Sequence, residues 1–367
     1  MQERTTPLPV SLFSTCPPAV LNEGPSYLAK VIDVARWSEE HGFTGILVVS
    51  DNAQMDPWLV AQLIVQNTQQ LCPLVAIQPV YMHPYAVAKA IATMGQLYNR
   101  RLYLNMVAGG FKNDLNALND QTPHDRRYDR LVEYTQIIKK LLASHGPVTY
   151  AGEFYQVTQL KLSPPLDPAL VPGIFISGSS AAGVRAAEDL EAVSIKYPEP
   201  ASVSDAKPET RNPLQLGVRI GIIARERRDE AWTVAHRRFP HDRKGQLTHQ
   251  LAMKVSDSEW HRQLSRVDAQ GETGRDLYWL EPFQNYKTFC PYLVGSYDAV
   301  ARELARYVRT GSRTFILDVP AAQEELPHIR IAFTVATELA DVSSNSLTEI
   351  CSSGGQTPGV YDPLRTL

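Results

Sequence analysis

The fold is decided by residues 101–110, R-L-Y-L-N-M-V-A-G-G, which open on apolar, β-favouring residues and stop on two glycines. This pattern predicts a buried parallel strand that carries Asn105 near its C-terminal end. The glycines would let the backbone pass close to a ligand. Residues 175–180, F-I-S-G-S-S, repeat the arrangement with a strand, a glycine and two hydroxyls at the start of a helix. Together the two stretches indicate a small anionic ligand such as a phosphate.

The rest of the chain alternates strand-like and helix-like patterns. Apolar runs typical of strands lie at 9–15, 43–50, 74–80, 101–108, 173–177, 192–197, 214–224 and 314–318. Amphipathic helical spacing recurs between them, which predicts an α/β fold, a (β/α)8 TIM barrel. An open doubly wound sheet is the alternative, but no G-x-G-x-x-G follows an early strand. In a barrel, functional side chains are expected at the C-terminal ends of the strands.

Three segments interrupt this alternation. Residues 148–161 alternate around a glycine and predict a hairpin. Residues 241–292 contain no clear strand, so we expect an insertion or lid before the eighth strand. The last helix is expected at 324–339, followed by a Ser/Gly/Pro-rich tail from 343 that is disordered or forms an arm. The predicted organisation is therefore one domain over 1–342 and a tail over 343–367.

Composition excludes several classes of protein. The 367 residues are 44% hydrophobic with a net charge of −3, which does not favour nucleic acid or an anionic membrane as partner. No run approaches the ~18 apolar residues of a spanning helix, and the first residues lack the apolar core of a signal peptide. The four cysteines are far apart without C-x-x-C, so neither a metal site nor a disulfide framework is predicted. A reducing cytoplasm is the expected location.

Six motifs occur in a specific order along the chain. They are N-M-V-A-G at 105–109, H-D-R-R-Y at 124–128, Y-A-G-E-F-Y-Q-V at 150–157, F-I-S-G-S-S-A-A at 175–182, L-G-V-R-I-G-I-I-A-R-E-R-R-D-E-A-W at 216–232 and L-V-G-S-Y-D-A-V at 293–300. Each motif alone is weak. The ordered set, across roughly 43–339, resembles the bacterial-luciferase-like flavin monooxygenases, and within them the alkanesulfonate monooxygenase branch.

This resemblance implies a two-component monooxygenase. Reduced FMN would come from a separate NAD(P)H:flavin reductase, and O2 would add to the flavin as a C4a-peroxide that oxygenates a small organic substrate. Members of the family self-associate, which implies a homodimer or homotetramer.

The resemblance also assigns roles to individual residues. Asn105 would touch the isoalloxazine ring, while Tyr128 and the serines at 179 and 180 would hold the FMN phosphate. A helix N-terminus favours an anion there. Arg219 would be catalytic, stabilising developing negative charge. The cofactor-binding set is Asn105, Ala108, His124, Tyr128, Ser177, Gly178, Ser179 and Ser180. Purely structural roles are the alternatives for these residues. The serines could simply cap a helix, and Arg219 could form a structural salt bridge.

The residues expected around the substrate differ from those of the sulfonate branch. Where this chain has Gln54, that branch has a Cys, and where this chain has Gly221, it has a His. The branch also has a His where this chain has Thr15 or Cys16, and a Tyr where this chain has residues 319–320. The arginine of its mobile insertion has no clear match, although Lys287 lies near the right place. We therefore expect a substrate other than an alkanesulfonate, with Gln54, Gln78 and Lys287 on the substrate side. Asp318 could be a general base, but a solvated strand-end carboxylate is the favoured reading.

Two other functions remain open from sequence. One is an oxidoreductase of the same barrel family that uses the deazaflavin F420. The other is a flavin-binding protein without activity, because several side chains of the nearest branch are missing. The identity of the substrate, its presentation as a free or carrier-bound molecule, and the reductase partner are not specified by the motifs.

Overall fold

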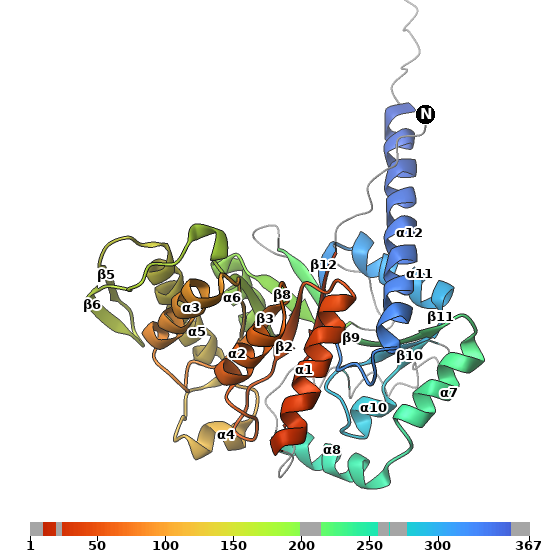
Figure 1. Cartoon of the computed structure of the whole chain (residues 1–367), viewed down its shortest axis with the longest axis horizontal. Coiled ribbons are helices and arrows are strands. Elements are labelled where there is room, and N and C mark those ends of the chain that lie inside the picture. The colour runs from red at the N-terminus through yellow and green to blue at the C-terminus, as the bar shows by residue number, and fades with distance from the viewer. Residues whose placement is uncertain (1–9, 20–23, 199–213, 256–263, 265–276, 354–367) are drawn as a thin grey trace, which may run out of the picture.

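A computed structural model describes residues 10–19, 24–198, 214–255, 264 and 277–353. Within these residues eight parallel strands close into a barrel, because β9 pairs with both β8 and β12. This confirms the predicted TIM barrel (Figure 1). In barrel order the strands are β1 (Ser11–Thr15), β2 (Gly45–Val48), β3 (Cys72–Ile77), β4 (Tyr103–Met106), β7 (Gly173–Ser177), β8 (Val193–Lys196), β9 (Leu216–Arg225) and β12 (Ser312–Leu317).

Helices follow the strands and cover the barrel. Their starts match the local sequence: Asp56 accepts hydrogen bonds from two backbone N–H groups before Pro57, and Ser180 caps the helix after β7. The helices are α1 (Gly24–Glu40), α2 (Pro57–Asn67), α3 (Pro84–Tyr98), α5 (His124–Ala143), α6 (Ala181–Leu190), α7 (Arg228–Arg238), α11 (Tyr297–Arg309) and α12 (Glu325–Ser353).

The barrel interior is a packed apolar layer. It is made of Phe13, Leu47, Leu74, Phe175, Ile195 and Ile316, one from each of six strands. The rings of Phe13 and Phe175 meet edge to face with centroids 5.3 Å apart. Leu47 also lines the cavity described below, so this layer forms its floor.

The segment between β9 and β12 differs from the prediction. It contains α8 (Arg243–Val255), β10 (Tyr278–Trp279), α10 (Glu281–Gln284) and β11 (Tyr292–Ser296), and the sequence pattern predicts neither of these two strands. The first half of β9 belongs to the barrel, and its second half pairs in parallel with β11. The long apolar run of β9 is therefore buried first by the barrel strands β8 and β12 and then by β11. A continuous apolar run does not show where one set of neighbours ends and the other begins. Residues 256–263 and 265–276 of the predicted lid lie outside the described residues.

The smaller elements include the predicted hairpin, which is confirmed as β5 (Val148–Ala151) and β6 (Gln156–Leu160). A short α4 (Lys112–Ala117) follows β4, and a 3-10 turn, η1, covers Pro168–Leu170. Among the described residues, no helix has the length and apolar character needed to cross a membrane.

The C-terminal helix is longer than predicted. The expected end at 339 is wrong, because α12 continues to Ser353 and projects beyond the barrel (Figure 1). No glycine or proline stands between Pro327 and Gly354, so nothing in the sequence stops the helix earlier. The remainder of the predicted tail, 354–367, lies outside the described residues.

Candidate active site

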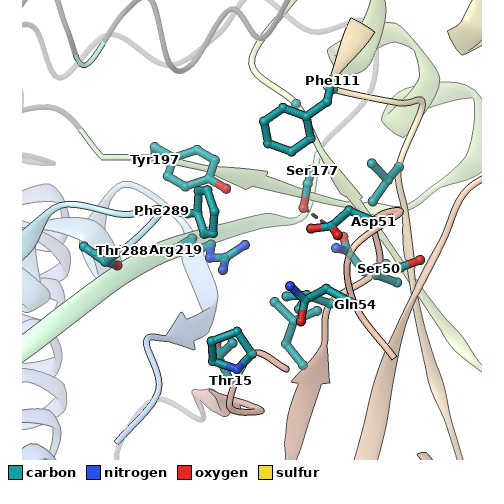
Figure 2. A pocket seen from close by; sticks show the side chains of 18 of the residues that line it. Thr15, Ser50, Asp51, Gln54, Phe111, Ser177, Tyr197, Arg219, Thr288 and Phe289 are labelled. Carbon is teal, nitrogen blue, oxygen red and sulfur yellow. Dashed lines mark hydrogen bonds between the residues drawn. The ribbon is translucent and has the colours of Figure 1, made fainter. Parts of the chain in front are cut away.

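A cavity of about 350 Å³ opens at the C-terminal ends of the barrel strands. Its size falls within the ~300–1,000 Å³ typical of small-molecule sites. In Figure 2, Arg219 projects into the space, with Tyr197 and Phe289 on one side and Ser50, Asp51 and Gln54 on the other. Every residue of the predicted site lines this cavity: Gln54, Gln78, Asn105, Ala108, His124, Tyr128, Ser177, Gly178, Ser179, Ser180, Arg219 and Lys287.

Asn105 and Ser177 are joined at the ends of neighbouring strands. The Ser177 hydroxyl donates to Asn105 Oδ1 over 2.8 Å. Both residues come from the paired strands β4 and β7. Because the carbonyl oxygen of Asn105 is engaged, the orientation of its amide is set, and the NH2 group is the part available to a ligand.

Tyr128 reaches from α5 to the start of α6. Burial raises the pKa of Tyr128, while a hydrogen bond with Ser180 works in the opposite direction. A Cβ at Gly178 would lie 2.4 Å from the Tyr128 hydroxyl oxygen, so only glycine leaves room for this approach. Ser180 Oγ also accepts from the Gly183 N–H at 3.2 Å. Ser180 therefore caps α6, which is the structural alternative from sequence, and it also lies beside the hydroxyl of Tyr128.

His124 begins α5 next to this corner. Its ring centroid lies 5.4 Å from that of Tyr128, and its Nδ1 is 2.7 Å from Asp125 Oδ1. The side chain is one-third exposed. The helix start thus places an imidazole and a phenol on one side of the cavity mouth, next to the N-terminus of α6.

Arg219 is a buried cation in an apolar strand. It is 9% exposed, and its Nε has no hydrogen-bond partner. Desolvation lowers its pKa, but Tyr197, Cys290 and Asp318 together outweigh this and raise it. No ion pair within 4.0 Å joins Arg219 to a carboxylate among the described residues. The guanidinium therefore stays charged, with a donor that no described group satisfies.

Asp318, at the end of β12, is held by two hydroxyls. Thr288 Oγ1 and the Tyr292 hydroxyl both donate to its Oδ2, over 2.8 and 2.5 Å. The ring of Tyr292 packs against the backbone of Gly221, where a Cβ would lie 2.3 Å from ring carbons. Tyr292 therefore fills the space in which the sulfonate-branch pattern places a histidine.

The three residues expected on the substrate side are already bonded to protein. Gln54 Oε1 accepts from the Ala19 N–H at 2.8 Å, and Gln78 Nε2 donates to the Ser50 carbonyl at 3.0 Å. Lys287 forms an ion pair with Asp242 at 2.7 Å. These contacts hold the cavity wall, and a direct role toward a substrate stays a prediction.

Tyr197, at the end of the sixth predicted strand, is one of the strand-end positions that a barrel predicts as functional, and it lines the cavity. Other lining residues have no such signal in the sequence, among them Phe111, Arg238, Thr288 and Phe289. Thr288 and Phe289 come from the insertion, and Arg238 from the end of a helix, where position relative to the strands gives no guidance.

The similarity to known proteins agrees with this architecture. The model of the luciferase-like monooxygenase family matches residues 10–314. The chain belongs to that family. A curated relative, 4-(gamma-L-glutamylamino)butanoyl-[BtrI acyl-carrier protein] monooxygenase BtrO from Niallia circulans, is 33% identical over 309 residues, covering 82% of this chain and 89% of the relative. Family and relative together identify this chain as a monooxygenase.

Solved structures share the luciferase-like fold. The riboflavin lyase RcaE, solved with modified FMN and riboflavin, has a TM-score of 0.65 at 15% identity, covering 97% of this chain and 94% of RcaE. An F420-dependent secondary alcohol dehydrogenase has a TM-score of 0.61 at 15% identity, covering 90% of this chain and 99% of that enzyme. Members of this fold therefore bind flavins or F420.

Proposed function

We propose that this luciferase-like monooxygenase uses reduced FMN, delivered by a separate flavin reductase, to oxygenate an organic substrate. The observation that carries the proposal is the corner where Tyr128 meets Gly178 and Ser180 at the N-terminus of α6. Backbone N–H groups and hydroxyls converge there in the way a phosphate requires. The phosphate would anchor the nucleotide, and the ring would extend toward Asn105.

The residues of the cavity fit this cofactor. Tyr128 and the α6 N-terminus, with Ser179 and His124 beside them, would hold the phosphate, while the Asn105 amide, oriented by Ser177, would contact the ring. When bound, reduced FMN supplies the two electrons by which one atom of O2 enters the substrate and the other leaves as water. Arg219 would stabilise negative charge at the reacting centre, since its Nε has no partner among the described residues.

The substrate is proposed to be an acyl compound rather than an alkanesulfonate. The space that the sulfonate-branch histidine would need is filled by Tyr292, which argues against retention of that specificity. The relationship to BtrO, named for an acyl group on a carrier protein, supports an acyl chain presented in the same way.

The direct test is isotope incorporation. Purified protein, reduced FMN and ¹⁸O2 would be mixed with acyl groups loaded on a carrier protein, with the matching free acids, and with octanesulfonate. We expect one ¹⁸O atom in an acyl product and no release of sulfite. Sulfite release would overturn the substrate assignment, and an absence of label from all products would overturn the oxygenase mechanism.

The alternative cofactor is F420, which the fold similarity to an F420-dependent enzyme keeps in view. Both cofactors carry phosphate, so the α6 corner alone does not separate them. Titration of the protein with FMN and with F420, followed by quenching of intrinsic fluorescence, discriminates the two. Saturable binding of F420 without binding of FMN in either oxidation state would replace the proposed function by the deazaflavin alternative.

A further inference from the structure

Arg238 and Asp318 line the same cavity and lie against the same ring, that of Tyr292. Arg238, at the end of α7, donates to the backbone carbonyl of Val319, the residue that follows Asp318. Its guanidinium stands over the Tyr292 ring, 5.5 Å from the centroid, and the hydroxyl of that ring holds Asp318. All three of Arg238, Asp318 and Val319 line the cavity. Tyr292 is therefore a common support for one positive and one negative group.

The two charges retain bonding capacity. No ion pair within 4.0 Å links Arg238 and Asp318 to each other, or either of them to another charged group of the described residues. Both hydroxyl contacts of Asp318 fall on Oδ2, and its Oδ1 has no hydrogen-bond partner among the described residues. Oδ1 is also absent from the buried unpartnered atoms of that part of the chain, so it faces accessible space.

Both side chains are half-buried, and neither charge is neutralised by an ion pair within the described residues. Partly buried charges gain from a ligand that pairs and hydrogen-bonds with them. A guanidinium beside a carboxylate is complementary to a group that carries an anion and a cation close together. The buried Arg219, which has an unpartnered Nε and acts electrostatically on Asp318, adds positive charge and disfavours a purely cationic ligand.

We propose that Arg238 and Asp318 bind the amino-carboxylate end of an amino acid or aminoacyl substrate. The carboxylate faces the Arg238 guanidinium, and the ammonium donates to Asp318 Oδ1. The inference rests on the proposed function in that it assigns the substrate part of the same cavity. Phe289, in the same cavity wall, offers an apolar surface to the carbon chain.

The test is a matched ligand series with the full-length protein and no flavin. L-glutamate carries both charges of the amino-carboxylate, glutarate lacks the ammonium, and 4-aminobutanoate lacks the α-carboxylate. Dissociation constants from calorimetry or ligand-detected NMR are expected to be about tenfold lower for L-glutamate than for either analogue. Equal binding of L-glutamate and glutarate by the wild type would overturn the proposal without any variant.

Two substitutions assign the preference to these side chains. Asp318→Asn keeps an oxygen that accepts from Thr288 and Tyr292, and it should abolish the preference over glutarate. Arg238→Gln should abolish the preference over 4-aminobutanoate. The exposed ion pair Arg302–Asp298 on α11 provides matched controls, Asp298→Asn and Arg302→Gln, which should keep both preferences. Preferences that survive both cavity substitutions in folded variants would contradict the proposal.

FMN is titrated into the wild type in a separate experiment. Failure of FMN binding with the amino-acid preference intact would refute the proposed function and leave this inference standing. FMN binding without the amino-acid preference would refute this inference and leave the proposed function standing.

Discussion

The ring of Tyr292 occupies the space that a side chain on Gly221 would need. A Cβ at Gly221 would lie 2.3 Å from two carbons of the ring, and the ring is fully buried. Residues 71 positions apart in the chain therefore pack against each other, through the parallel pairing of β9 and β11. The hydroxyl of the same ring donates to Asp318, which lines the cavity, so the pair lies directly behind the cavity wall.

Substitution of Gly221 should be costly. Gly221→Ala forces the Tyr292 ring to move within a packed region, and we expect a loss of about 1–3 kcal/mol in the free energy of unfolding, measured by urea denaturation. Gly146→Ala is the control, since nothing lies within 4 Å of its Cβ. The double variant Gly221→Ala/Tyr292→Ala should show non-additive losses. Equal stability of the two single glycine variants would show that Tyr292 does not constrain position 221.

Gly178 should control access of the Tyr128 hydroxyl to the cofactor. Gly178→Ala places a methyl group 2.4 Å from the hydroxyl oxygen and displaces the phenol from the N-terminus of α6. We expect FMN affinity to fall about tenfold or more, as for loss of a hydrogen bond to a charged group. Fluorescence titration measures this, with Gly146→Ala again as control. Unchanged FMN affinity in a folded Gly178→Ala protein would place the phosphate elsewhere.

Arg219 should distinguish the oxidation states of the cofactor. Reduced FMN carries a negative charge on its ring near neutral pH, and the oxidised ring is neutral. Arg219→Met should therefore weaken binding of reduced FMN by about tenfold more than binding of oxidised FMN. Anaerobic titration of both forms gives the ratio, and Arg302→Met, on the surface of α11, is the control. If the ratio is the same in Arg219→Met and wild type, Arg219 does not face the flavin ring.

Two buried thiols predict a specific loss of stability at alkaline pH. Burial raises the pKa of Cys16 and of Cys290 to about 12, from a value near 9.0. Above pH 9 the unfolded chain releases these protons while the folded chain retains them, so stability falls as pH rises toward 12. Cys290→Ala should reduce the steepness of that fall by about one proton, or ~1.4 kcal/mol per pH unit. Urea unfolding at pH 7.5, 9 and 10 measures the difference, and parallel curves for variant and wild type would contradict it.

The barrel and the location of the cavity could be predicted from sequence because both follow from local patterns. Apolar runs define the strands, and barrel closure brings their C-terminal ends together whatever the loops do. Asn105, Ser177 and Arg219 lie on or at the ends of strands, and each reaches the one cavity. At Ser180 the sequence pattern does not separate helix capping from ligand binding, because the side chain both caps α6 and lies beside Tyr128.

Features that depend on side-chain packing between distant segments could not be predicted. The complementarity of Gly221 and Tyr292 requires the pairing of β9 with β11, a strand that lies at the end of an insertion without clear periodicity. The orientation of Arg238 over Tyr292 depends on the end of α7, not on a strand. The polar composition from residue 343 predicts a tail, but no helix-breaking residue stands before Gly354, and α12 continues to Ser353.

The central claim is that the hydroxyl of Tyr128 and the N-terminus of α6 hold a phosphate. Titration of FMN and riboflavin, which differ only in that phosphate, tests it most directly. We expect the wild type to bind FMN at least tenfold more tightly than riboflavin, and Tyr128→Phe to lose most of that preference. Tyr150→Phe removes a hydroxyl from the β5–β6 hairpin and should leave the preference intact. Equal affinity of the wild type for FMN and riboflavin, or an unchanged preference in Tyr128→Phe, would contradict the account.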